Sequence, residues 1–119
     1  MYLLLLVLND ENHVKEVLER FVDIDVRGAT VINSQGMGRI ISEKIPIFSS
    51  LRNILSGEEN RVNNFTIFSA IKTEETLNKA IDVVLSVVKD INKPGTGILL
   101  VLPILKIYGF ANNSLNQEK

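Results

Sequence analysis

The sequence predicts an α+β fold: a ferredoxin-like βαββαβ sandwich with a long loop between its two halves. The main observation is a repeat, because the order of strand, acidic cap, helix, Asp-Ile turn, glycine and strand occurs twice along the chain. The second observation is length, because 119 residues suit a single domain with one core. The absence of cysteine excludes a disulfide framework, so packing alone must hold this core.

The first half begins with a strand and a helix. Tyr2–Leu8 is wholly apolar, short for a helix and followed at once by polar turn residues, which predicts a buried strand. Asn9 or Asp10 is expected to cap a helix whose apolar residues recur at helical spacing. The run 28–33 predicts a second strand. The apolar stripe of this helix consists of Val14, Val17, Leu18, Phe21 and Val22.

The second half repeats this order. Phe65–Ile71 is rich in β-branched and aromatic residues and predicts a strand. Thr73 is expected to cap the next helix, with two carboxylates facing the positive end of the helix dipole. Lys93–Gly97 cannot continue a helix, and Ile98–Leu102 predicts the last strand. The second apolar stripe consists of Leu77, Ala80, Ile81, Val84, Leu85, Val88 and Ile91.

The first and last predicted strands have apolar residues on both faces. Two helices cover only one face of a four-stranded antiparallel sheet, and the other face normally carries polar residues. Tyr2–Leu8 and Ile98–Leu102 do not alternate, so their second face must be hidden. We therefore expect a homo-oligomer whose sheets face one another, for which a C₃ ring is one arrangement. The alternative is a strand edge covered by the chain's own loop.

Charge and composition exclude several classes of partner. A formal net charge of −1 argues against a protein that binds nucleic acid or an anionic membrane. The Tyr2–Leu8 run is far shorter than the roughly 20 apolar residues of a membrane-spanning helix. We expect a cytoplasmic protein with one domain at 1–110 and a polar tail at 111–119.

The segment 38–63 joins the two halves and exceeds the usual connection of about 4–6 residues. It contains large apolar side chains, several of them at helical spacing. Either this segment docks on its own domain, or it is a mobile arm whose apolar face binds a partner protein. The candidate partner-binding residues are Ile45, Ile47, Phe48 and Leu51.

Groups of residues typical of catalysis are missing from the sequence. His13 is the only histidine, and its place near a helix start predicts an exposed side chain. The carboxylate pairs Asp23/Asp25 and Glu74/Glu75 lie at helix ends, where capping and dipole effects explain them. No triad or metal-ligand spacing is present, so we expect neither enzymatic activity, nor a catalytic residue, nor a metal site.

The glycines are the residues that most suggest a ligand-binding site. Gly36–Gly38 and Gly95–Gly97 lie at strand ends, where glycine allows a positive φ and close approach of a ligand. Successive free N–H groups in such loops can bind anions. Together with Arg39, the two clusters would form a phosphate cradle if folding or assembly brings them together. The alternative is that each cluster only makes a turn, and no Walker or dinucleotide-binding fingerprint is present.

Two segments resemble those of the PII nitrogen-regulatory signalling proteins. The run from Val26 to Arg39 resembles the segment that leads into the T-loop of that family, and Gly95–Ile104 resembles its B-loop and last core strand. The resemblance covers 1–110 and implies a homotrimer that binds an effector such as ATP, ADP or AMP between subunits. It also implies docking on a transporter or enzyme through the 38–63 T-loop. The implied ligand-binding residues are Gly28, Thr30, Gly36, Met37, Gly38, Arg39, Gly95, Thr96, Gly97 and Lys106.

Three positions depart from the pattern of the family. Ile98 stands where PII proteins have a lysine after the B-loop glycines, and Ile40 stands where they have a glutamine. Lys106–Tyr108 replaces an Arg-Ile-Arg segment. Loss of a cation that contacts phosphate predicts an affinity lower by roughly 10–200-fold. A monophosphate, a diphosphate or a different small ligand is then as good an expectation as a triphosphate.

Two other functions fit the same predicted fold. The first is a CutA-like trimer that binds a divalent cation or acts as a scaffold, although the chain offers few soft ligands for a transition metal. The second is a small phosphatase of the acylphosphatase type, which is a fold analogy with Arg39 as its only support.

Overall fold

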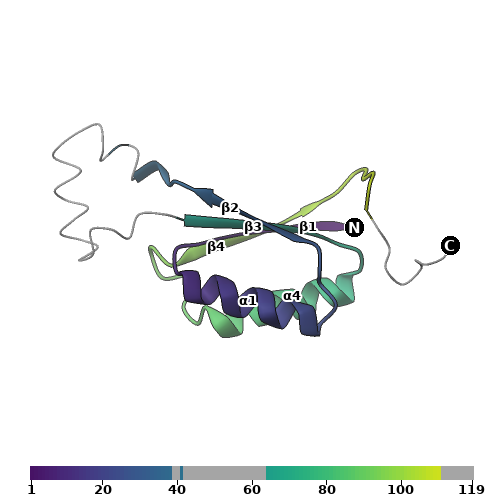
Figure 1. The fold of residues 1–119 in the computed structure, drawn as a ribbon, viewed down its shortest axis with the longest axis horizontal. Helices are drawn as coiled ribbons and strands as arrows, with labels where there is room; N and C mark the ends of the chain where they lie inside the picture. Colours follow the sequence, from purple (N-terminus) through teal and green to yellow (C-terminus); the bar gives the residue numbers. More distant parts are fainter. Residues whose placement is uncertain (39–40, 42–63, 111–119) are drawn as a thin grey trace.

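The computed structural model describes residues 1–38, 41 and 64–110. These residues form one four-stranded sheet with the strand order β2-β3-β1-β4, and every neighbouring pair is antiparallel. Both helices cover the same face of the sheet (Figure 1). The predicted βαββαβ sandwich is therefore confirmed, while its assembly as a trimer stays a prediction. The elements are β1 (Tyr2–Leu8), α1 (Glu11–Asp23), β2 (Ala29–Ser34), β3 (Asn64–Ile71), α4 (Glu74–Val87) and β4 (Gly97–Pro103).

The core lies between the helices and the sheet. Alternate residues of β1 point toward the helices, and Leu4, Leu6 and Leu8 are buried there. The apolar stripes of α1 and α4 pack on them, as the helical spacing predicts. The buried helix residues are Val14, Val17 and Phe21 in α1, and Leu77, Ala80, Val83, Val84 and Val87 in α4. Two residues of the predicted stripes, Val22 and Leu85, are exposed instead.

Both helix starts are capped by side chains. The Asp10 carboxylate accepts a hydrogen bond from the Asn12 N–H at 2.9 Å, which decides between the two predicted caps of α1. The Thr73 hydroxyl accepts one from the Thr76 N–H at 3.2 Å, as predicted for α4.

The end of α4 differs from the prediction. The apolar stripe continues to Val88 and Ile91, but the helix ends at Val87, because Val88 leaves the helical region with φ −102° and ψ 89°. Val88 is buried, and Ile91 packs partly against the core. The residues that follow the helix therefore still pack against the core, although they are no longer helical. Neither helix in the described ranges combines the length and apolar character that crossing a membrane requires.

The face of the sheet opposite the helices is uncovered within the described chain, and it is apolar over β1 and β4 but mixed with polar residues over β2 and β3; we call it the open face. It carries alternate residues of every strand, starting from Leu3, Leu5 and Val7 in the middle. Around them, large side chains are between 36% and 49% exposed. This confirms the expectation that both faces of these strands are apolar. The exposed large side chains of the open face are Ile32, Phe68, Ile98, Leu100 and Leu102.

Candidate ligand-binding site

The two glycine clusters lie at the same end of the sheet. Gly36–Gly38 follow β2, and Gly95–Gly97 lead into β4. Because β2 runs parallel to β1 and β4 runs antiparallel to it, the end of β2 and the start of β4 share one end (Figure 1). The two strands are opposite edges of the sheet, however. With β3 and β1 between them at about 4.8 Å per step, the clusters are roughly 14 Å apart. One chain therefore does not bring them together.

Three of the predicted ligand residues lie at the other end of the sheet. Gly28 and Thr30 are at the start of β2, and Lys106 follows β4. The side chain of Thr30 lies on the open face, since this residue pairs with Phe68. The carbonyl of Gly28 accepts a hydrogen bond from the Ser69 hydroxyl at 3.1 Å.

The remaining predicted residues divide into exposed and undescribed ones. Met37 is 74% exposed, next to Gly36 and Gly38. The anion-binding candidate Arg39 lies outside the described residues, so its part in a cradle stays a prediction. The partner-binding candidates lie outside them as well: Ile45, Ile47, Phe48 and Leu51.

The segment from Lys93 to Thr96 forms a tight turn. The Thr96 N–H donates to the Lys93 carbonyl at 3.2 Å, with Pro94 second and Gly95 third. Gly95 has φ +82°. Proline at the second position and a positive φ at the third are the pattern of a type II turn. Glycine at this position therefore has a structural reason that involves no ligand.

Gly97 is required by the packing of β4 on β1. It pairs with Leu8, and a Cβ atom at this position would lie 2.6 Å from the Val7 carbonyl oxygen and 2.9 Å from Leu8 Cδ2. Gly28 differs, because a Cβ added there meets no described atom within 4 Å. The fold of the described chain thus explains Gly97 but not Gly28.

The turn leaves few backbone donors for an anion. Pro94 has no N–H, and the Thr96 N–H is used within the turn. Within the described residues, the Gly95 N–H has no hydrogen-bond partner. In this conformation, the Gly95 N–H is therefore the backbone donor that the turn can offer to a ligand.

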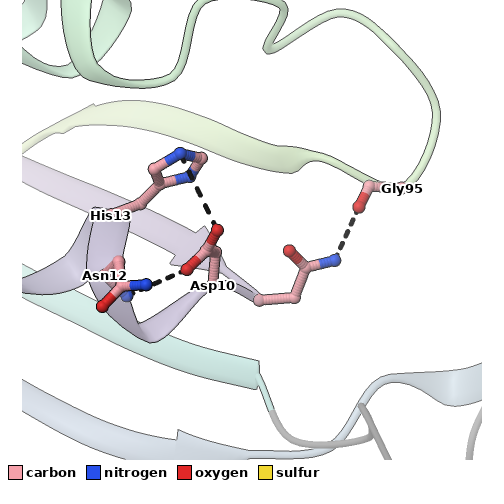
Figure 2. A network of polar contacts seen from close by, with 5 residues as sticks. Asp10, Asn12, His13 and Gly95 are labelled. Carbon is pink, nitrogen blue, oxygen red and sulfur yellow. Dashed lines mark hydrogen bonds and ion pairs between the residues drawn. The ribbon is translucent and has the colours of Figure 1, made fainter. Parts of the chain in front are cut away.

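Asn9 contacts this turn from the end of β1. Its side-chain amide donates to the Gly95 carbonyl at 2.6 Å (Figure 2). Sequence reasoning considered Asn9 only as a helix cap, since the two residues are 86 positions apart. No local pattern in the sequence could have revealed this contact.

His13 lies near this contact, on the first turns of α1. Its Nε2 is 3.9 Å from Asp10 Oδ2, and its side chain is 35% exposed (Figure 2). The side chain, predicted to be exposed, is thus partly exposed and lies beside its own helix cap. No group of three or more His, Cys, Asp or Glu side chains among the described residues is placed to hold a metal ion.

Comparisons with known proteins support the fold. No protein-family model and no curated protein sequence matches the chain. Among solved structures, it is similar to Arabidopsis thaliana PII bound to citrate, with a TM-score of 0.56 and 16% sequence identity. The match covers 87% of this chain and 76% of that chain. The resemblance to PII proteins is thereby confirmed at the level of the fold.

Proposed function

We propose that the protein is a PII-like regulator that binds a small anionic effector between the subunits of a homotrimer. The effector is an adenine nucleotide, and the 38–63 loop passes its binding state to a partner transporter or enzyme. The observation that carries this proposal is the placement of Gly36–Gly38 and Gly95–Gly97 at one end of the sheet but on opposite edges. A site that uses both clusters needs two chains.

The surface of the chain favours such an assembly. The open face is apolar over β1 and β4, and neither edge strand, β2 or β4, contains a charged residue that would oppose pairing or stacking. A ring with C₃ symmetry joins unlike surfaces of neighbouring copies. It would bring the β4 edge of one copy close to the β2 edge of the next, and with it the two glycine clusters.

The effector is anionic because of the groups that would meet in this cleft. The Gly95 N–H and the Thr96 hydroxyl would come from one copy, and Arg39 would add charge-assisted hydrogen bonds. Gly28, Thr30 and Lys106 lie at the far end of the sheet, so we assign them to the cleft only as contributions from another copy.

The identity of residue 98 sets the expected charge of the effector. Ile98 pairs with Val7 and lies on the open face, so it extends the apolar surface where a PII protein has a cation. With fewer positive charges in the cleft, a mono- or diphosphate fits better than a triphosphate. Citrate is a useful non-nucleotide probe, since the similar Arabidopsis PII structure contains it.

Signalling requires that the effector bind two conformations of the loop with different affinities. Equal affinity for both conformations would leave the equilibrium between them unchanged. Gly36–Arg39 would couple the two functions, because this run belongs both to the cleft and to the root of the 38–63 segment. The partner would then contact the apolar residues of that segment, which are Ile45, Ile47, Phe48 and Leu51.

Isothermal titration calorimetry with ATP, ADP, AMP and citrate, each with and without Mg²⁺, tests the proposal. Light scattering after size exclusion should first give the mass of a trimer. We expect AMP or ADP to bind with about one site per subunit, and Arg39→Ala to weaken that binding. A trimer that binds none of the probes, or an Arg39→Ala variant with unchanged affinity, would contradict the effector site.

A scaffold of the CutA type is the second candidate. The structural reasons for Gly95 and Gly97, together with Ile98 on the open face, favour a trimer that has no phosphate site. Thermal unfolding with copper or zinc ions separates a cation-binding form from a pure scaffold. A melting temperature that these ions leave unchanged would exclude the cation-binding form.

A further inference from the structure

We propose that Asn9 is a positioning residue, which holds the Lys93–Thr96 turn so that the Gly95 N–H faces the anionic group of the effector. This inference rests on the proposed function and deepens it. Asn9 itself is not expected to touch the effector, because its amide is already bonded to the Gly95 carbonyl at 2.6 Å.

The backbone of Asn9 is fixed on both sides. Leu8 is 1% exposed and belongs to the core, so the residue before Asn9 cannot move freely. Asp10 caps α1 through its side chain, and its carbonyl accepts the Val14 N–H at 3.1 Å. A short side chain that projects from such a base has few orientations available. Asn9 therefore provides a rigid anchor rather than a mobile contact.

The hydrogen bond from Asn9 is the second of two bonds that hold the Gly95–Thr96 peptide plane. The carbonyl of the Gly95–Thr96 peptide accepts from Asn9, and its N–H donates to the Lys93 carbonyl at 3.2 Å. Two hydrogen bonds on one peptide restrict its rotation about the flanking bonds. The Gly95 N–H, which has no partner within the described residues, belongs to the preceding peptide of the same turn, so ordering of the turn limits the directions in which this N–H can point.

A fixed donor improves binding because the turn does not have to be ordered when the effector arrives. Removing the bond should therefore weaken the phosphate contact and leave the contacts of the nucleoside unchanged. The expected loss is that of one neutral hydrogen bond, roughly 3- to 10-fold in affinity.

The experiment compares Asn9→Ala, Asn9→Asp and the control Asn12→Ala. Asn12 lies three residues after Asn9, in the first turn of α1, and its exposed side chain makes no hydrogen bond within the described residues. Each protein is titrated with ADP and with adenosine. We expect Asn9→Ala to weaken ADP roughly 3- to 10-fold, with adenosine unchanged. Asn9→Asp should weaken ADP further, since a carboxylate cannot donate and repels phosphate. Asn12→Ala should match the wild type.

Amide hydrogen exchange of Thr96 in the free protein gives a second readout. Faster exchange in Asn9→Ala, but not in Asn12→Ala, would show that Asn9 holds the turn. Unchanged ADP affinity in Asn9→Ala would overturn the inference while the proposed function stands. Equal losses for ADP and adenosine would overturn it too, because they indicate general damage. Wild-type protein that binds neither probe nor citrate would refute the proposed function, and the role of Asn9 with it.

Discussion

Asp25 is the only described non-glycine residue with a positive φ, which is 67°. It lies just after α1, where its N–H donates to the Val22 carbonyl at 3.1 Å. The next N–H, of Val26, donates to the Phe21 carbonyl at 2.9 Å. These two bonds form a Schellman motif, which usually has glycine at the position of Asp25. The ion pair with Arg27 at 3.2 Å is well exposed and offsets little of the backbone cost.

Replacing Asp25 by glycine should therefore stabilise the protein. We expect Asp25→Gly to raise the free energy of unfolding by about 0.5–1 kcal/mol, because glycine adopts the left-handed conformation without a Cβ penalty. Urea denaturation measures this change. The control Asp23→Gly lies inside the last turn of α1, where glycine is the poorer helix former by about 0.3 kcal/mol, so it should not stabilise the protein. A destabilised Asp25→Gly protein would contradict the conformational argument.

At the scale of elements, the helix caps are the contacts whose energy is easiest to isolate. Thr73 accepts the Thr76 N–H at 3.2 Å, and its hydroxyl also lies 3.1 Å from that of Thr76. We expect Thr73→Ala to lower the free energy of unfolding by about 1 kcal/mol, whereas Thr73→Ser keeps the acceptor and most of the stability. Thermal or urea unfolding of both variants checks this. If Thr73→Ala and Thr73→Ser lowered the free energy of unfolding equally, the methyl group of Thr73 and not its capping hydroxyl would be the stabilising part.

The elements that local pattern determines were predictable, and those that depend on distant contacts were not. β1 is a continuous apolar run and α1 has a regular stripe, so both follow from spacing alone. The end of α4 does not, because Val88 is buried and Ile91 is partly buried after the helix has stopped. In the site, the glycines were visible in the sequence. That a Cβ at Gly97 would meet the Val7 carbonyl, and that the Asn9 amide donates to the Gly95 carbonyl, depends on contacts between residues far apart in the sequence.

At the scale of the whole molecule, the described chain is a sheet with one covered and one open face. Its largest apolar side chains on the open face, such as Phe68 and Leu100, are 36% and 44% exposed. A contiguous apolar surface of this kind marks an interaction site in a soluble protein. The homotrimer proposed above would cover this surface with further copies, which offer the same apolar residues, and the edge strands carry no charge that opposes this.

Two matched substitutions can show whether the subunits associate through the open face or through the helices. Leu100 is 44% exposed on the open face beside Leu5, and Leu85 is 43% exposed on α4, away from the sheet. We expect Leu100→Asp to convert the proposed trimer into monomers, because burial of an unpaired carboxylate costs several kcal/mol per subunit. Leu85→Asp, matched in chemistry and exposure, should remain a trimer. Light scattering after size exclusion reads out both masses. A trimeric Leu100→Asp protein would mean that the open face is not the interface, and dissociation of Leu85→Asp alone would assign the interface to the helices.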